Sequence, residues 1–479
     1  MRDHLRFVLN GRPQTVRGSA AFGSLTDYLR GQLGLAGTKV VCAEGDCGAC
    51  TVLVGRPAGD GLRYAPVDAC IQFLYQLDGT QVVTVEGLSA NGDLHPVQRA
   101  MVDCHGSQCG YCTPGIVMAL AGWAEAGCRD DARLALTGNL CRCTGYLSIL
   151  DAAAAIAAVP ADSVSSRYDT PALVSEMRGW AAEPLHVTDG RRKFAAPTRL
   201  EDAVTFKAAY PGAVVVAGGT ELGVLRNKRG DDPAAILTLA RVPGLGAIER
   251  QDDRVAIGAN ATWAQIERDL VPVLPALGPI VSRFGSPQIR AVATLAGNVV
   301  HGSPIADSLP LLLVMDAELE LVGPHGVRRR SVNGFCTGYK QKDMAADELL
   351  ARVTLSLPAA GERLRLYKVS RRNDLDIATF GAAVRIHESG GRIESAAVAY
   401  SGVGPTVVRL PRTEAALTGR PFRESTFRHA GRVARSEAAP ITDVRGGRDF
   451  RAQLAENILV KFYFEEVNEG RFAASGASA

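Results

Sequence analysis

The distribution of cysteines limits the fold of this chain more than any other feature of its sequence. Ten of the eleven cysteines precede residue 145, although the chain has 479 residues. Thiols gathered in this way indicate metal or redox chemistry when a protein is kept in a reducing compartment. A chain of this length is also too long for one hydrophobic core, so we expect two to four domains.

The sequence shows no sign of secretion or of a membrane span. Charged residues at positions 2, 3 and 6 lead directly into a strand-like alternation, without the apolar segment of a signal peptide. The most apolar helical stretch, 150–159, has about half of the roughly 20 residues that a span requires. The formal net charge of +3 gives no reason to expect nucleic acid or an anionic membrane as a partner. We therefore expect a cytoplasmic protein with reduced cysteines.

The first cysteine group consists of Cys42, Cys47, Cys50 and Cys70. The first three have the spacing C-x4-C-x2-C, and the fourth follows about twenty residues later, which is the plant-type [2Fe–2S] arrangement. Glycines inside the loop let its backbone turn and bring N–H donors towards the sulfurs. Structural zinc sites usually pair two C-x2-C units, so the spacing favours iron–sulfur over zinc.

The second cysteine group consists of two pairs, Cys109 with Cys112 and Cys141 with Cys143. Pro114 predicts a helix that begins just after the first pair, and the positive end of a helix stabilises thiolates. By itself this group is also compatible with zinc. Beside a ferredoxin-type group, a second iron–sulfur cluster is the favoured interpretation, and two clusters would make the chain an electron carrier.

Hydrophobic periodicity separates the cysteine-rich part into two segments. Residues 5–9 alternate and Asn10-Gly11 predicts a tight turn, so 1–85 should form a small mixed sheet with one helix. The period then becomes helical over 86–160. The stretch 160–193 is irregular and rich in small residues, which predicts a linker.

Beyond residue 194 strands and helices alternate, with a new pattern from about residue 366 and a closing helix over 452–466. A β-branched run over 213–217 ends in Gly218-Gly219, a turn whose backbone N–H groups would accept a pyrophosphate. The pattern is not G-x-G-x-x-G, so it does not predict a Rossmann domain, and a plain turn between strand and helix explains it equally well. A second stretch, 294–307, is dense in small and hydroxyl residues and ends in an Asp that would accept from a ribitol or ribose hydroxyl.

Three long stretches, 41–51, 106–115 and 138–146, resemble the molybdenum hydroxylase family. The resemblance implies that both cysteine groups bind [2Fe–2S] clusters. It also implies that the second cluster lies nearer the molybdenum cofactor and the first nearer a flavin. Gln108 matches a glutamine that approaches the pterin, which would belong to another chain.

The resemblance covers residues 3–475 and implies a multidomain α+β fold. The implied domains are a β-grasp ferredoxin-like [2Fe–2S] domain (1–85), an all-α four-helix [2Fe–2S] domain (86–162), a linker (163–190), a vanillyl-alcohol-oxidase-type (PCMH) α+β FAD domain (191–362) and a small α/β domain like the CO dehydrogenase flavoprotein C-terminal domain (363–475).

The resemblance also implies which residues contact FAD and places no catalytic residue on this chain beyond the FAD itself. The implied contacts are Val215, Val216, Ala217, Gly218, Gly219, Thr220, Glu221, Leu222, Phe284, Thr294, Leu295, Ala296, Gly297, Asn298, Asp307, Leu350 and Lys368.

Since no molybdopterin domain follows in this sequence, the resemblance to the xanthine dehydrogenase branch of the family implies a separate molybdopterin-binding large subunit. Two small and two large chains are expected, with purine oxidation on the partner and NAD+ as acceptor. One alternative is an aldehyde or N-heterocycle hydroxylase with another acceptor. An alternative of a different class is a non-catalytic, zinc-binding scaffold protein.

Overall fold

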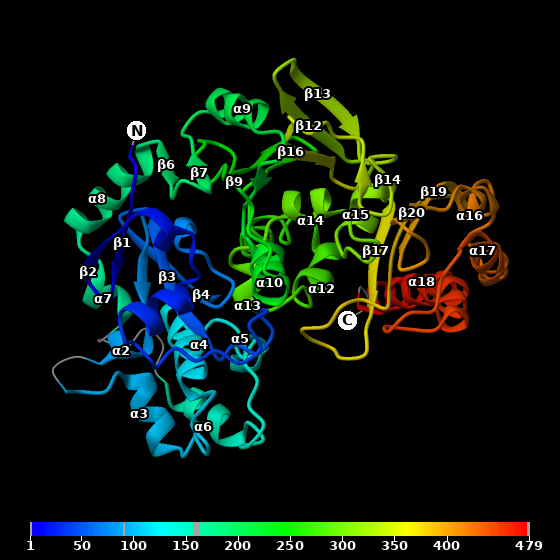
Figure 1. Cartoon of the computed structure of the whole chain (residues 1–479). Coiled ribbons are helices and arrows are strands. Elements are labelled where there is room, and N and C mark those ends of the chain that lie inside the picture. The colour runs from blue at the N-terminus through cyan, green and yellow to red at the C-terminus, as the bar shows by residue number, and fades with distance from the viewer. Residues whose placement is uncertain (1, 90–91, 157–162, 477–479) are drawn as a thin grey trace. The chain divides into compact units, whose positions relative to one another are not determined.

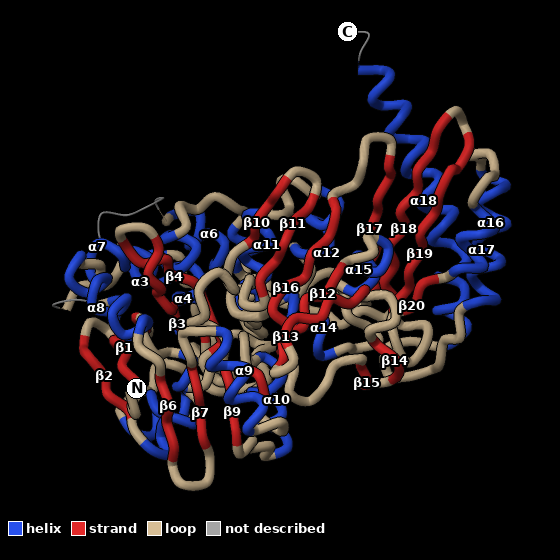
Figure 2. The backbone as a smooth tube through the Cα atoms, turned by 90° about the horizontal axis from the view of Figure 1, so that it is seen from above, coloured by secondary structure: helices blue, strands red, loops and turns tan. Residues whose placement is uncertain are grey.

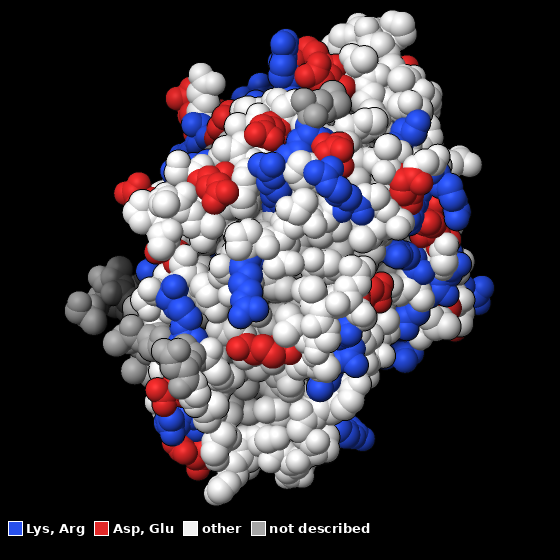
Figure 3. Space-filling model, turned by 60° about the vertical axis from the view of Figure 1, so that its left-hand side comes forward, with Lys and Arg blue, Asp and Glu red and all other residues white. Residues whose placement is uncertain are grey.

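The computed structural model describes residues 2–89, 92–156 and 163–476. Its contacts divide the chain into two units, with unit 1 comprising Met1–Pro243 and Gly285–Ala293, and unit 2 comprising Gly244–Phe284 and Thr294–Ala479. Within the described ranges, no helix has the length and apolar character needed to cross a membrane. Basic and acidic side chains are interspersed on the face in Figure 3.

Unit 1 begins with a five-stranded mixed sheet in the order β2-β1-β5-β3-β4. The predicted hairpin is confirmed, since the first two strands pair antiparallel across the Asn10-Gly11 turn. The first strand pairs parallel with the last, which is the arrangement of a β-grasp sheet. The short helix α1 (Leu25–Asp27) runs into a π-helical turn over Tyr28–Gln32. The strands are β1 (Leu5–Leu9), β2 (Arg12–Val16), β3 (Thr51–Ala58), β4 (Gly61–Asp68) and β5 (Gln81–Val83).

The next segment is helical, as its periodicity predicts (Figure 1). Its longest helix, α4, is apolar along most of its length and packs against β3, where a Cβ on Gly122 would lie only 2.9 Å from Leu53. Residues 157–162, which close the predicted helical domain, lie outside the described ranges. The helices are α2 (Val85–Leu88), α3 (Pro96–Asp103), α4 (Thr113–Glu125), α5 (Ala132–Ala135) and α6 (Leu147–Ala155).

The prediction that the stretch 160–193 is irregular was wrong for its described residues. It contains α7 (Val164–Tyr168), α8 (Pro171–Ala182) and strand β6 (Leu185–Thr188). Thr170 caps α8 by accepting from the Leu173 N–H at 3.1 Å. The buried face of α8 carries one apolar residue per turn, a spacing too sparse to stand out among its small and charged neighbours.

Unit 1 also contains a second sheet, in the order β6-β7-β9-β8, in which β7, β9 and β8 are parallel. Both sheets of unit 1 share one hydrophobic core, in which the ring of Tyr75 stacks on that of Phe194 at 4.6 Å. The predicted strand over 213–217 is reduced to two residues. The remaining elements are β7 (Lys193–Ala196), β8 (Val214–Val215), β9 (Ala235–Leu237), α9 (Leu200–Ala209), α10 (Thr220–Arg229) and α13 (Pro287–Arg290).

Unit 2 begins with an antiparallel sheet in the order β10-β11-β16-β12-β13. Its apolar strands place Leu319, Leu321 and Val353 in the core. The elements are β10 (Ile248–Gln251), β11 (Arg254–Gly258), β12 (Glu318–Gly323), β13 (Gly326–Ser331), β14 (Cys336–Gly338), β15 (Gln341–Lys342), β16 (Leu349–Ser356), α11 (Trp263–Asp269), α12 (Gly278–Val281), α14 (Leu295–His301) and α15 (Leu309–Val314).

The C-terminal part of unit 2 is an antiparallel sheet, β17-β18-β19-β20, with α16, α17 and α18 beside it (Figure 2). Phe380, Tyr400, Phe427 and Phe462 fill the core between strands and helices. The closing helix predicted over 452–466 is confirmed and extends further at both ends. The elements are β17 (Glu362–Val369), β18 (Phe380–Ser389), β19 (Arg392–Ser401), β20 (Val408–Arg409), α16 (Pro411–Leu417), α17 (Glu424–Glu437) and α18 (Arg448–Gly476).

Candidate functional site

The first cysteine group converges in unit 1, where the loop before β3 meets the turn after β4. The Cys42 thiol hydrogen-bonds with the thiols of Cys47 and Cys70, and Cys70 also contacts Cys50. Cys50 and Cys70 are buried, whereas Cys42 and Cys47 are half-buried. The four side chains that the spacing predicts as ligands are therefore brought together.

The loop backbone directs N–H groups at the Cys42 sulfur. Ala43 and Gly45 have φ values of 56° and 74°, and the N–H groups of Glu44 and Asp46 lie 3.5 and 3.4 Å from the sulfur. Hydrogen bonds from the neighbouring thiols, and then from these N–H groups, hold the pKa of Cys42 well below its ordinary value. The same thiol contacts raise the pKa values of Cys47 and Cys70, so the convergence of the four sulfurs and the N–H groups directed at Cys42 are what suit this loop to a metal cluster.

The second cysteine group also converges, in the helical part of unit 1. The thiols of Cys109 and Cys143 lie 3.6 Å apart, and those of Cys112 and Cys141 hydrogen-bond to each other. Burial, followed by the bond to Cys141, raises the pKa of Cys112 to about 12. Cys109 and Cys143 are exposed, as is Gln108, which precedes the first of them.

Each group brings four thiols together, the number that a two-iron cluster takes, two on each iron. In the second group the thiols meet as two pairs, Cys109 with Cys143 and Cys112 with Cys141. In the first group Cys42 contacts both Cys47 and Cys70, and Cys70 also contacts Cys50.

A buried hydrogen-bond network joins the two cysteine groups. The Leu140 N–H, one residue before Cys141, donates to the Cys47 carbonyl at 2.9 Å. The Asn139 amide donates to the Gly48 carbonyl at 3.0 Å and accepts from Gln288 at 2.8 Å. Sequence reasoning gave these bridging residues no role, because a side chain that binds a distant backbone carbonyl leaves no local pattern.

The glycine turn after β8 lies close to other backbone in unit 1. A Cβ on Gly218 would lie 2.2 Å from the Val292 carbonyl oxygen, and Gly219 has a φ of 71°. The Ala217 carbonyl accepts from the Gln76 side chain at 2.9 Å. The turn opens α10, a ten-residue helix whose first N–H groups lack helical partners, so its geometry suits a phosphate.

In unit 2, Thr294 caps α14 by accepting from the Gly297 N–H at 3.0 Å, and Asn298 accepts from Ser308 at 2.6 Å. The Phe284 ring stacks on Trp263 at 4.2 Å. Leu350 is buried in β16. These predicted flavin residues therefore have structural contacts of their own.

Asp307 and Lys368, which lie far apart in the sequence, form a buried ion pair in unit 2. The Lys368 ammonium lies 2.7 Å from Asp307 and donates to the Arg283 carbonyl at 3.0 Å, and its side chain is 2% exposed. Burial raises the pKa of Asp307, although the charge of Lys368 opposes this change. The Arg283 guanidinium donates to Ser370 and to the Asn373 carbonyl, which fixes the loop after β17.

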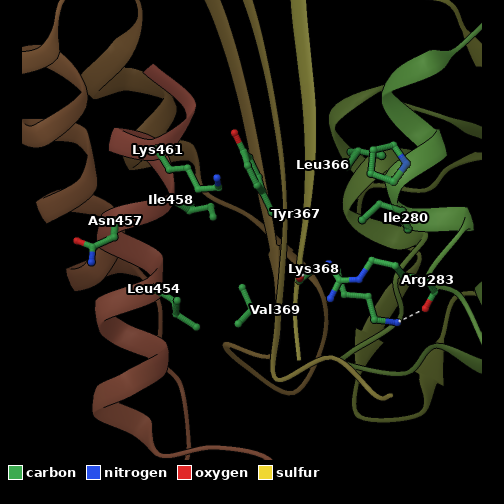
Figure 4. A pocket seen from close by; sticks show the side chains of 11 residues that line it. Ile280, Arg283, Leu366, Tyr367, Lys368, Val369, Leu454, Asn457, Ile458 and Lys461 are labelled. Atoms are coloured by element: carbon green, nitrogen blue, oxygen red, sulfur yellow. Dashed lines mark hydrogen bonds between the residues drawn. The ribbon is translucent and has the colours of Figure 1, made fainter. Parts of the chain in front are cut away.

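A cavity of about 300 Å³ lies on the other side of β17, between this strand, α12 and α18 (Figure 4). Its lining is mostly aliphatic, with the Tyr367 ring on one wall. The Lys368 ammonium points away from it, towards the Arg283 carbonyl (Figure 4). Arg283 and Lys368 themselves form part of the cavity lining.

Three family models match consecutive parts of the chain. Residues 84–154 match a [2Fe-2S] binding domain, 190–359 match the FAD binding domain in molybdopterin dehydrogenase, and 365–466 match the CO dehydrogenase flavoprotein C-terminal domain. The first matched region contains the second cysteine group, and the second contains the glycine turn and the Thr294 cap.

Curated relatives match almost the whole chain. Xanthine dehydrogenase/oxidase of Gallus gallus is 28% identical over 96% of this chain and 40% of its own length. Aldehyde oxidase 2 of Rattus norvegicus is 30% identical over 98% of this chain and 39% of its own length. The chain thus spans about two fifths of the length of these relatives.

Among solved structures, carbon monoxide dehydrogenase from Hydrogenophaga pseudoflava aligns with a TM-score of 0.54 and 28% identity, over 57% of this chain and 95% of that chain. Quinoline 2-oxidoreductase from Pseudomonas putida 86 aligns with a TM-score of 0.53 and 27% identity, over 56% of this chain and 94% of that chain. Together with the two cysteine groups, these similarities identify the chain as a member of the molybdenum hydroxylase family, in which it is an electron-transferring part that carries [2Fe–2S]-binding and FAD-binding domains.

Proposed function

We propose that this chain passes electrons from a molybdenum-containing partner to NAD+ within a xanthine dehydrogenase. The two cysteine groups would each hold a [2Fe–2S] cluster. The glycine turn in unit 1, with Thr220 to Leu222 after it, would bind FAD. When bound, these groups supply one-electron chemistry at the clusters and two-electron chemistry at the flavin, while the protein positions them and tunes their potentials.

The observation that carries this proposal is the order of the sites within unit 1. The second group, whose Cys109 and Cys143 are exposed, is joined to the first group by the hydrogen bond from the Leu140 N–H to the Cys47 carbonyl. The first group in turn touches α10, since a Cβ on Gly223 would lie 2.6 Å from Ile71, the residue after Cys70. This continuous contact supports electron flow from the second group to the first and then to the flavin.

The exposure of the second group supports a partner at that point. Tyr111, Leu140 and Leu147 expose apolar surface beside the cysteines, at 49%, 60% and 75%. Gln108, also exposed, would reach the pterin of the partner's molybdenum cofactor. The proposed partner is a molybdopterin-binding large subunit in a cytoplasmic heterotetramer.

Cofactor content tests the electron-transfer function directly. Two irons in each of two clusters and one FAD per chain are expected in anaerobically purified protein, with two distinguishable signals in electron paramagnetic resonance (EPR). Zinc without visible absorption would revive the scaffold alternative, which the [2Fe-2S] and FAD domain matches oppose. Iron without flavin would refute the role of the glycine turn.

The substrate is tested on the complex purified with its copurifying chain. We expect hypoxanthine and xanthine to reduce NAD+. The relatives include aldehyde oxidases at comparable identity, so an aldehyde or N-heterocycle substrate with another acceptor is the second candidate. Turnover of aromatic aldehydes, without NAD+ reduction by either purine, would favour that candidate and refute the first.

A further inference from the structure

Three consecutive side chains near the end of α10 reach the ferredoxin-type part of unit 1. Arg226 donates to the Phe22 carbonyl, and its guanidinium lies over the Phe73 ring at 5.5 Å. Asn227 and Lys228 instead contact the backbone that carries the first cysteine group. The helix that begins at the proposed flavin turn therefore ends on the proposed cluster loop.

Asn227 joins the two segments that supply the first cysteine group. Its amide nitrogen lies 2.8 Å from the Cys70 carbonyl and 2.9 Å from the Ala43 carbonyl, so both of its N–H bonds are used. Ala43 follows Cys42 directly, and its φ of 56° turns its carbonyl outwards while the next N–H points inwards. One side chain thus braces the loop against the turn that carries the fourth cysteine.

The hydrogen bond from Asn227 to the Ala43 carbonyl also affects a cysteine sulfur. The Ala43 carbonyl and the Glu44 N–H belong to the same peptide group, and this N–H lies 3.5 Å from the Cys42 sulfur. A peptide group that accepts a hydrogen bond at its oxygen becomes a stronger donor at its nitrogen. Asn227 therefore strengthens the donor that faces the sulfur, without touching the sulfur itself.

Lys228 brings a positive charge to the same loop. Its ammonium donates to the Cys42 carbonyl at 2.7 Å and lies 3.3 Å from the Glu44 carboxylate. Its side chain is 45% exposed, so solvent screens part of this charge. In the absence of Lys228, the carboxylate of Glu44 would act on the loop without its counter-charge.

We propose that Asn227 and Lys228 are positioning residues that raise the reduction potential of the cluster held by Cys42, Cys47, Cys50 and Cys70. The proposal rests on the proposed function, since it requires a [2Fe–2S] cluster on these cysteines. Reduction adds one negative charge to the cluster, and N–H donors to sulfur and nearby positive charge stabilise the reduced form. The two residues would thus favour the arrival of the electron at the cluster next to the flavin.

The test is an EPR-monitored redox titration of the complete complex, which gives the midpoint potential of each cluster separately. For Lys228→Met and for Asn227→Ala, we expect the equilibrium constant for reduction of one cluster to fall about three- to tenfold, and tenfold corresponds to about 59 mV for one electron. The other cluster should keep its potential. Lys228→Arg retains the charge and should remain near the wild type.

Two further variants serve as controls. Arg229→Met removes an equally basic, exposed side chain from the next position of α10 and should leave both potentials unchanged. The double variant Lys228→Met with Glu44→Gln removes both charges of the ion pair and should recover part of the loss seen in Lys228→Met alone.

Unchanged potentials of both clusters in Lys228→Met and Asn227→Ala would overturn the proposal, and so would an equal shift in Arg229→Met. If Asn227→Ala fails to assemble the cluster of the first cysteine group, the potential measured for Lys228→Met alone decides the outcome, because Lys228 is exposed. Wild-type protein without two cluster signals would instead refute the proposed function, so the two failures are distinguishable.

Discussion

Gly218 shows how one residue can decide whether the proposed flavin turn forms. Any side chain there would collide with backbone, since a Cβ would lie 2.2 Å from the Val292 oxygen and 2.5 Å from its carbon. Backbone cannot rotate away as a flexible side chain would. The turn itself would have to shift.

We therefore expect Gly218→Ala to weaken FAD binding at least about tenfold, or about 1.4 kcal/mol, while the iron content stays unchanged. Flavin released on denaturation and a fluorescence titration with FAD measure this effect. Gly212→Ala is the matched control, because the added methyl group there meets nothing within 4 Å. Equal affinities for the two variants would contradict the role of the turn.

Cys109 allows the direction of electron flow to be tested at one residue. Cys109→Ala should remove the second cluster and abolish NAD+ reduction by substrate, while the flavin still oxidises NADH with an artificial acceptor. Cys104 lies in the same helical segment but outside both cysteine groups, so Cys104→Ala should retain both activities. Normal NAD+ reduction by substrate in Cys109→Ala would show that electrons take another route.

At the scale of single residues, the sequence predicts those whose spacing is set by the chemistry of the proposed site. The x4 and x2 intervals between Cys42, Cys47 and Cys50 are those expected of one loop that wraps a cluster, and they can be read directly from the sequence. Asn227 and Asn139 could not be found in this way. Both side chains donate hydrogen bonds to backbone carbonyls of distant segments. The residues next to them in the sequence therefore carry no signal of these contacts.

At the scale of elements, local sequence signals predicted correctly those elements that pair with their neighbours in the sequence. The hairpin over 5–16 follows from alternation and its Asn-Gly turn. Helix α8 was missed, because its small buried face is stabilised by packing against other elements of unit 1 rather than by its own sequence. The elements on either side of α8 are also held by an ion cluster that no local pattern reveals.

Asp78 is the centre of that ion cluster. It pairs with Arg2 at 2.7 Å and with Arg241, and its side chain is 3% exposed. The Arg2 guanidinium also donates to the Trp180 carbonyl at the end of α8. The cluster thus connects the N-terminal strand region, α8 and the segment after β9.

We expect Asp78→Ala to destabilise unit 1 by about 3–5 kcal/mol, because it removes the carboxylate that pairs with the buried Arg241 and leaves the buried Arg2 with only the half-exposed Glu183. Hydrogen exchange of the amides in β6 and β1 measures the loss as a lower free energy of opening. Asp3→Ala removes an exposed carboxylate and should change these rates little. Equal protection in Asp78→Ala and wild-type protein would show that the cluster does not stabilise this region.

At the scale of the molecule, the sequence predicts the order of the segments but not the division of the chain into units. Tyr75 and Phe194 come from segments that read as separate domains, yet they stack in one core. The matched FAD domain, 190–359, contributes residues to both units. Periodicity describes each element separately, and therefore cannot show which elements share a core.

The two proposed clusters should differ in how readily they lose iron, because the second cysteine group has two exposed members, Cys109 and Cys143, and the first has none. In the isolated chain under reductant, an iron chelator should therefore remove the cluster of the second group before that of the first. The two EPR signals, followed over time, measure the two rates. A bound partner should slow only the first loss. Equal rates in the isolated chain would contradict the exposure of the second group.

Unit 1 is discontinuous, and this has a consequence for biosynthesis. Residues 285–293 belong to it, although 244–284 precede them in the chain and belong to unit 2. Ile289 packs towards Gly45 in the first cysteine loop, and Gln288 binds the Asn139 that bridges the two groups. A nascent chain therefore cannot place Gln288 and Ile289 against the two cysteine segments until about 290 residues have been translated and have left the ribosome. Full packing of the first cysteine loop is thus a late event in the synthesis of this chain.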